Sequence, residues 1–436
     1  MFERMKSPLF LPTYDYRNGS VRRSFVQAPN FSARGRFKSS VIEPALVCDR
    51  RRPVKKPAET RIQKWVEVCA QPWSPNLILD SGLDKLATVV WADTFLYAVA
   101  GTGNTPVSDD SSTTTVSQSG TALTLSGTLA AVSAGKLIRW DTGEEAMVVS
   151  GSGTAWVADR SQSVSAGQFT VYRVDQTGLD TELSGTAGRS NNYLAGSPDC
   201  DTTRSGAVYT MTRTYDFGSP SISSNYAEVG VSNSNVQANN LFSRMLITGG
   251  SVTVLTTQQL RLSYQLRLTV GPITPVSKTA SITGWPISPA TTTDGTEQMA
   301  FIGLSKVNTA GTSGSWDGFN NINRTSEPSV TGQIFLSTNA SAHLTYPDGP
   351  DRLSAATKVN TTLASYTAGS FLIDKSGVYA PSEAVGTSWR SMGLIGSSGA
   401  SQQDLTFAFL FDQAQSKDNT HTLTLTFRFN WARDLS

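Results

Sequence analysis

The chain contains 436 residues, with 36 Lys or Arg, 34 Asp or Glu and only two His, and its formal net charge at pH 7 is +2. Because general acid–base and metal chemistry usually depend on histidine, this composition argues against a histidine-based active site. No stretch approaches the ~20 apolar residues that a membrane helix needs, and the first residues lack the order of a secretory signal, so neither membrane insertion nor export by that route is expected.

The residue types predict a mainly β protein with roughly two to four domains. The chain is rich in Ser and Thr, and 36 Gly and 19 Pro interrupt it, which favours short strands and turns over long helices. Nine Trp, twelve Tyr and eighteen Phe supply large side chains for the cores of two or more β-sandwich-like domains. Three Cys without CxxC spacing indicate neither a disulfide framework nor a zinc site, and no cofactor is expected.

The beginning of the chain differs in charge from the rest. Residues 1–64 hold 15 Lys or Arg against five Asp or Glu, whereas residues 65–436 hold 21 against 29. Prolines recur between the basic residues and no sustained period is visible, so residues 1–61 are predicted to form an extended basic arm. Aromatic residues also recur there, which is unusual for a solvated tail and favours ordering against an acidic neighbouring subunit. The arginines expected to contact this partner are Arg22, Arg23, Arg34, Arg36, Arg50, Arg51 and Arg52.

Two separate stretches, residues 62–111 and 177–271, are predicted to form a first β-sandwich domain. Within the first stretch, Leu79–Ala87 is expected to be a short helix, and Asp80 or Ser81 could cap the free backbone donors at its start. The apolar run that follows, Trp91–Val99, is expected to be a buried strand that ends at a turn containing Gly and Pro.

Residues 112–176 are predicted to form a small inserted β-domain. A Ser- and Thr-rich stretch opens this segment, and short strand candidates then recur at a spacing of ~8–12 residues. Loop tips tolerate such insertions well. Because the residue pattern of the strand region before this segment appears again after it, we expect the first domain to continue there.

Residues 272–436 are predicted to form a C-terminal β-sandwich domain. The strongest strand signals of the chain are Leu260–Val270 and Leu423–Trp431, in which apolar and polar residues alternate without interruption. Both halves of the chain end on such a segment. A divergent duplication is one interpretation of this pattern, and two unrelated sandwiches are the other.

Candidate catalytic groups are few. The two histidines, His343 and His421, lie far apart in sequence, and no serine lies in a Gly-x-Ser-x-Gly elbow. Carboxylate pairs such as Asp109-Asp110 and Glu144-Glu145 could serve a glycosidase, but they lie in contexts typical of solvated loops. The sequence therefore predicts no enzyme and no metal site.

The run Leu96–Pro106, with its Tyr-Ala-Val-Ala-Gly-Thr-Gly-Asn-Thr-Pro core, resembles structural proteins of tailed bacteriophages. The later segments Tyr226–Val231 and Leu241–Arg244, followed by Val252–Val270, look like the closing "EVG…LFxR…" run of the same proteins. The resemblance implies β-domains that assemble around a tail or neck axis, or that form appendages. The inserted domain and the basic arm depart from the core pattern of that family.

Together these features predict a virion structural subunit, made in the host cytoplasm and placed in the phage tail or head–tail junction. Its expected partners are copies of itself and other virion structural proteins. The alternatives are a tail fibre or other appendage that binds a host receptor or cell-surface glycan, a capsid decoration protein and a polysaccharide-cleaving tail enzyme. For the arm, contact with nucleic acid and a loose solubilising tail are the other interpretations. A glycan would stack on Trp140, Trp156, Trp285 or Trp316.

Overall fold

The structure is a computed structural model, and it is mainly β, as predicted. In the residues that it describes, the helical elements are α1 (Asp80–Thr88), α2 (Gly185–Gly188) and the 3-10 helix η1 (Trp91–Phe95). The described residues are 23–27, 31–47, 62–89, 91–110, 113–194, 201–205, 208–236, 240–270, 276–281, 292–298, 333–338, 357–360, 362–363, 366–385, 388–395, 405–417, 419–420 and 422–435.

A 14-stranded sheet forms the body of the molecule. Nine of its strands follow one another in the order β12 (Arg189–Ser190), β5 (Tyr97–Gly101), β16 (Glu228–Ser232), β17 (Leu241–Leu246), β4 (Ser74–Ile78), β2 (Phe31–Val47), β19 (Gln259–Val270), β14 (Val208–Asp216) and β13 (Asp201–Ser205). The other five are β1 (Arg23–Gln27), β3 (Ile62–Ala70), β24 (Thr362–Leu363), β25 (Leu372–Tyr379) and β28 (Leu423–Arg433). A separate two-stranded sheet joins β15 (Ser224–Tyr226) to β18 (Val252–Val254).

The predicted extended arm over residues 1–61 is wrong for residues 31–47, which form the strand β2 inside the chain's own sheet. β2 pairs antiparallel with β19 from Phe31↔Val270 to Ile42↔Gln259, and its other partners are β3, β4 and β28. Between residues 32 and 41 the alternate side chains, including those of Ala33, Phe37 and Val41, are buried. The alternation escaped sequence reasoning because small residues occupy part of the buried face.

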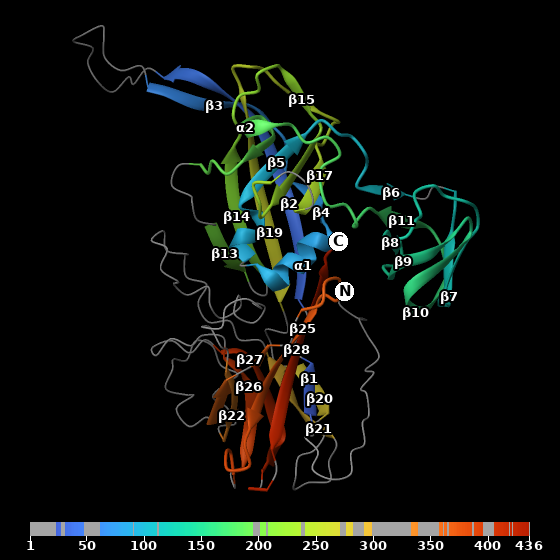
Figure 1. Cartoon of the computed structure of the whole chain (residues 1–436), viewed down its shortest axis with the longest axis vertical. Helices are drawn as coiled ribbons and strands as arrows, with labels where there is room; N and C mark the ends of the chain where they lie inside the picture. The colour runs from blue at the N-terminus through green and yellow to red at the C-terminus, as the bar shows by residue number, and fades with distance from the viewer. Residues whose placement is uncertain are drawn as a thin grey trace, which may run out of the picture.

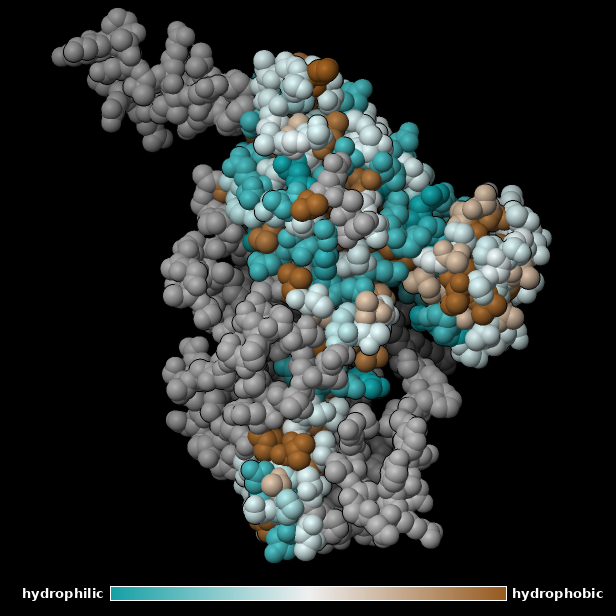
Figure 2. Space-filling view, viewed as in Figure 1, coloured by the Kyte–Doolittle hydropathy of each residue, from teal (hydrophilic) through white to brown (hydrophobic). Residues whose placement is uncertain are grey.

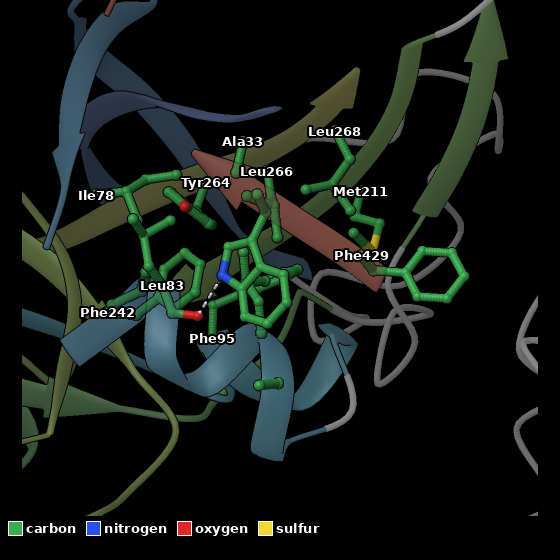
Figure 3. Close-up of a cluster of buried hydrophobic side chains, with 14 of the residues drawn as sticks. Ala33, Ile78, Leu83, Phe95, Met211, Phe242, Tyr264, Leu266, Leu268 and Phe429 are labelled. Carbon is green, nitrogen blue, oxygen red and sulfur yellow. Dashed lines mark hydrogen bonds between the residues drawn. The ribbon is translucent and has the colours of Figure 1, made fainter. Parts of the chain in front are cut away.

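The upper part of the sheet curls around one hydrophobic core. Phe242 in β17 and Tyr264 in β19 are separated in strand order by β4 and β2, yet their ring centroids lie 6.4 Å apart. Phe37 and Phe95 contact the Tyr264 ring as well, at centroid distances of 4.8 and 5.1 Å. Figure 3 shows Phe95, Phe242 and Tyr264 gathered between the strands and α1. The curled sheet therefore encloses its core in the manner of a sandwich.

The helix α1 closes one end of this core, and the predicted side-chain cap is wrong. Residue Leu79 occupies the N-cap position without a side-chain hydrogen bond. Ser81 Oγ instead donates to the Leu241 carbonyl oxygen at 2.6 Å, and Asp80 pairs with Arg433. A Cβ at Gly82 would overlap the Phe242 carbonyl oxygen, so glycine lets the helix lie close against β17. The side chains of Asp80 and Ser81 therefore make tertiary contacts, and no side chain caps the start of α1.

The segment Trp91–Val99 is only partly the strand that its sequence predicts. Its first five residues form η1, and β5 begins at Tyr97. Short apolar runs fit a buried helix turn as well as a buried strand, so periodicity could not separate the two. The helical turn places the Phe95 carbonyl oxygen where Arg213 donates to it at 3.1 Å.

The lower part of the molecule is a second sandwich (Figure 1). One layer is a six-stranded sheet of β20 (Val276–Ser281), β21 (Thr292–Gln298), β27 (Leu405–Gln415), β26 (Trp389–Ile395), β22 (Gln333–Ser337) and β23 (Thr357–Asn360). The facing layer contains β25, β28 and β1. The Tyr379 hydroxyl on β25 donates to the Ile334 carbonyl oxygen on β22 at 3.0 Å, so the two layers are in direct contact.

The two sandwiches share strands, and residues before the predicted boundary at residue 61 contribute to both of them. β1 runs parallel to β28 from Arg23↔Thr424 to Gln27↔Arg428, and β2 continues beside it at Phe31↔Trp431. At the top of β28, the Trp431 indole donates to the Leu83 carbonyl oxygen at 2.9 Å (Figure 3). The last strand, β28, thus pairs with β1 in the lower sandwich and with β2 in the upper one, and it joins the two.

Residues of the predicted insert 112–176, together with Ser108–Asp110 just before it, form a sheet with its own core. Its six strands, in spatial order, are β6 (Ser108–Asp110), β11 (Phe169–Tyr172), β8 (Leu137–Trp140), β9 (Glu145–Ser152), β10 (Ala155–Gly167) and β7 (Val116–Leu125). Trp140 lies at the centre of the core, 1% exposed, and its indole donates to the Val116 carbonyl oxygen at 2.8 Å. Figure 1 shows this sheet projecting from the side of the upper sandwich.

A buried lysine in the lower sandwich predicts a pH dependence of stability. Burial lowers the pKa of Lys375, on β25, from 10.5 to about 7. Between these two values the unfolded chain binds more protons than the folded chain, so the contribution of Lys375 to stability rises with pH across that window. Below about pH 7 the folded chain bears the full cost of a buried ammonium.

Lys375→Met is therefore expected to gain stability over the wild type near neutral pH, and to lose most of that advantage near the ordinary lysine pKa. Thermal unfolding of both proteins across this pH range checks the prediction. Unfolding curves of the two proteins that shift in parallel at every pH would contradict it.

No helix in the described part of the chain is long and apolar enough to cross a membrane.

Candidate interface

The predicted interface residues Arg34 and Arg36 lie on the polar face of the large sheet. They occupy alternate positions of β2, so both point to the face opposite the core. Register places Arg34 opposite Arg267 and Arg36 opposite Gln265 on β19. All four side chains are half-buried, because neighbouring long side chains cover one another on an open sheet face. We call Arg34, Arg36 and Arg267 the basic face.

The geometry around Arg36 holds its guanidinium in place without neutralising it. Its Nε donates to Gln265 Oε1 at 2.5 Å, and its Cζ lies 4.9 Å from the centroid of the Trp73 ring. Burial lowers the pKa of Arg36, and the positive charges of Arg267 and Arg34 lower it further. The amide and the indole therefore orient a cation that has other cations beside it.

Two other cations on the same sheet face have carboxylate partners. Lys38 Nζ lies 3.7 Å from Glu67 Oε1, and Arg261 Nε lies 2.6 Å from Asp216 Oδ1. Within the described residues, no such ion pair neutralises Arg36 or Arg267. Arg36 and Arg267 therefore place two positive charges on the neighbouring strands β2 and β19. Such an arrangement attracts an acidic surface and repels a basic one.

The remaining predicted arginines do not join this face in the described structure. Arg23 lies in β1, in the lower sandwich, at the position paired with Thr424. The other four, Arg22, Arg50, Arg51 and Arg52, lie outside the described residues. Sequence reasoning missed Arg267 and Trp73, although the uninterrupted alternation around Arg267 already placed it on the polar face of a strand.

A second cluster of charges lies beside the connections of the insert and is built on a buried ion pair. Glu228 on β16 and Arg244 on β17 are both 0% exposed, and Arg244 Nε donates to Glu228 Oε2 at 2.9 Å. Arg244 also donates to Asp180 Oδ2 at 2.7 Å and to Gln176 Oε1 at 3.0 Å. Since each of the three guanidinium nitrogens donates to an oxygen, these hydrogen bonds offset part of the cost of burying the ions.

This cluster holds both connections of the insert. Glu228 Oε1 accepts hydrogen bonds from the backbone of Gly103, at 3.1 Å, in the incoming connection and of Thr181, at 2.8 Å, in the outgoing one. Any Cβ at Gly103 would overlap Glu228, so glycine is required there. We call Asp180, Glu228 and Arg244 the linker lock. Glu228, Arg244 and the Gly103 that they hold come from the segments that carry the resemblance to phage proteins, and their role here is structural.

Candidate catalytic groups are engaged in structural contacts. Asp109 Oδ2 lies 2.8 Å from Arg173 Nη2, and Glu145 Oε1 lies 3.7 Å from Arg139 Nε. In the part of the chain that the structure describes, no group of three or more His, Cys, Asp or Glu could hold a metal ion. His343 and His421 lie outside that part.

Of the four Trp residues predicted to stack on a glycan, the structure describes two. Trp140 is wrong as a platform because its ring is buried in the core of the insert. The Trp156 ring is half-buried, and its indole donates to the Gly153 carbonyl oxygen at 3.0 Å. Trp285 and Trp316 lie outside the described residues.

Comparisons of the chain with protein-family models, curated proteins and solved structures found no match.

Proposed function

We propose that the chain is a structural subunit of a tailed-phage virion that assembles into the tail or the head–tail junction and acts without chemical turnover. The observation that carries the proposal is the basic face, an excess of positive charge fixed on an open sheet of a rigid β framework. Its partner is an acidic surface of a neighbouring subunit. Residues 65–436 of this chain carry more acidic than basic residues, so a second copy is one source of such a surface.

The linker lock supports the link to the phage family. The Gly-Thr-Gly turn, the Glu of "EVG" and the Arg of "LFxR" are far apart in sequence, yet Gly103, Glu228 and Arg244 form one hydrogen-bonded unit. A motif whose residues converge on a buried structural contact is a determinant of fold. This fits a resemblance between scaffolds, and it favours an assembling protein over one defined by a catalytic motif.

The shared strands also suit a load-bearing role. β28 and the run of β1 and β2 join the two sandwiches by backbone hydrogen bonds, so the domains cannot separate without breaking a sheet. Domains joined by a flexible linker would move independently. In a rigid two-domain body with a projecting insert, the surfaces that contact other virion subunits stay at fixed distances from one another.

Reversing charge on the basic face is expected to block assembly. In the double variant Arg36→Glu and Arg267→Glu, the fold should persist because both side chains lie on the polar face of the sheet. Attraction to an acidic partner becomes repulsion, and incorporation into particles should fall by about tenfold or more, the equivalent of ~1.4 kcal/mol. Quantitative immunoblotting of purified particles measures the loss.

The matched control is Arg160→Glu, which reverses an exposed arginine on the insert that pairs with Asp159. It should enter particles at the wild-type level. Wild-type incorporation of the double variant, with its fold intact by circular dichroism, would overturn the proposed role of the basic face.

A further inference from the structure

The insert carries negative charge that its own ion pairs do not neutralise. Residues 108–176 contain seven Asp or Glu against four Lys or Arg. Each of the four cations pairs with one carboxylate, and the pairs are Lys136–Asp175, Arg139–Glu145, Arg160–Asp159 and Arg173–Asp109. Seven carboxylates minus four leaves three, those of Asp110, Asp141 and Glu144. Of these, Asp110 accepts a hydrogen bond from Thr170 Oγ1 at 2.8 Å.

The other two carboxylates lie together on the turn between β8 and β9. Asp141 and Glu144 are both exposed, and neither makes an ion pair in the part of the chain that the structure describes. The Gly143 N–H donates to the Trp140 carbonyl oxygen at 2.8 Å, and the Trp140 N–H donates to the Glu144 carbonyl oxygen at 3.0 Å. The Asp141 N–H donates to the Gln168 carbonyl oxygen at 3.1 Å. We call Asp141 and Glu144 the acidic turn, and these backbone hydrogen bonds hold it in place.

The basic face has the complementary charge. Register places Arg36 opposite Gln265, two positions from Arg267 on β19, so the two arginines are diagonal neighbours about 7–8 Å apart. The described ion pairs leave both of them without a carboxylate partner. Two cations and two carboxylates thus lie on two separate surfaces of one chain. Complementary charges of this kind attract two surfaces and select the orientation in which they meet.

The insert is held in place, so the acidic turn does not swing to the basic face of its own chain. Leu137 on β8 packs in one apolar cluster with Leu79 and Leu241 of the upper sandwich, and the linker lock holds both connections. Figure 2 shows the insert as a lobe at the side of the body, with hydrophilic residues on part of its surface. A projecting lobe of this kind can reach a neighbouring copy.

We propose that the acidic turn of one copy of this chain docks on the basic face of the next copy. This contact rests on the proposed function, in which the basic face binds an acidic partner, and it identifies that partner. Because two different surfaces meet, each copy in a contact keeps one acidic turn or one basic face free for a further copy. Repetition of such a head-to-tail contact closes a ring or extends a helical array. Both arrangements surround an axis, in agreement with the proposed place in a tail or head–tail junction.

A charge exchange between the two surfaces of the full chain tests the contact. The face variant carries Arg36→Glu with Arg267→Glu, and the turn variant carries Asp141→Arg with Glu144→Arg. In analytical ultracentrifugation the wild type should self-associate reversibly, and less so as salt rises. Each variant should associate about tenfold or more weakly, because like charges then meet. The variant with all four substitutions again brings opposite charges together and should associate like the wild type.

The matched control is Asp412→Arg, which reverses an exposed carboxylate on β27 in the lower sandwich. This substitution leaves both proposed surfaces unchanged, so the variant should associate like the wild type. Near-ultraviolet circular dichroism of every variant checks that its fold is intact.

Three results would overturn the proposed contact. They are a wild type that stays monomeric at every concentration, a turn variant that associates like the wild type, and a fourfold variant that associates no better than the face or turn variant. Incorporation into particles separates this failure from that of the proposed function. If the turn variant enters particles at the wild-type level and the face variant does not, the basic face binds another virion protein. Wild-type incorporation of both variants would contradict the proposed role of the basic face itself.

Discussion

A chain that starts at residue 62 should fail to fold, whereas a chain that starts at residue 23 should fold like the full protein. The shorter chain lacks β2, which pairs with β3, β4, β19 and β28. It also loses the buried side chains of Ala33, Phe37, Val41 and Ile42. A typical domain is stable by only ~5–15 kcal/mol, and loss of a central strand with its core contacts exceeds that margin.

Near-ultraviolet circular dichroism and cooperative thermal unfolding distinguish the two truncated chains. The chain from residue 23 is the matched control, since it keeps β1 and β2 in full. If the chain from residue 62 instead gave a soluble monomer with a cooperative transition, β2 would be a dispensable arm. In that case the shared-sheet description of the two sandwiches would be wrong.

Removing Arg244 should destabilise the protein more than removing any exposed arginine. Arg244→Met leaves Glu228 buried without its cationic partner, and breaking a buried pair in this way costs about 3–5 kcal/mol. The connections of the insert should also loosen, because the backbone of Gly103 and Thr181 is held through Glu228. Limited proteolysis should then cut near residues 102–107 and 173–183 before the rest of the chain.

The control for this prediction is Arg160→Met, which removes an exposed ion pair with Asp159 and should cost less than about 1 kcal/mol. Glu228→Gln alone and together with Arg244→Met completes a double-mutant cycle. A large favourable coupling between the two residues is expected. Equal losses from Arg244→Met and Arg160→Met, with no new cleavage sites, would show that the linker lock has no stabilising role.

Strong two-residue alternation made part of the fold predictable from sequence. Leu260–Val270 and Leu423–Trp431 place large apolar side chains at every second position, and they form the long strands β19 and β28. The same alternation is present in β2, but Ala33 and Gly35 hold buried positions and their small size hides it. The charged residues Arg34, Arg36 and Lys38 at every second position carry the same strand signal, but basic residues between prolines are also typical of an extended arm.

Contacts between residues far apart in the chain could not be predicted from the sequence. Arg244 meets Glu228 only because β16 and β17 pair antiparallel, and Arg36 meets Arg267 only through the register of β2 with β19. Likewise, Asp80 looked like a helix cap from its position, but its partner is Arg433 near the other end of the sequence. Local patterns specify elements, whereas these charges acquire their roles from the packing of distant elements.

Immunogold electron microscopy of purified particles, with antibodies against the exposed insert, tests the central claim most directly. The proposed virion role predicts gold at one defined position on the tail or the head–tail junction, and loss of that label when the particles carry Arg36→Glu with Arg267→Glu. Particles that assemble fully and infect their host without any of this protein would contradict the claim.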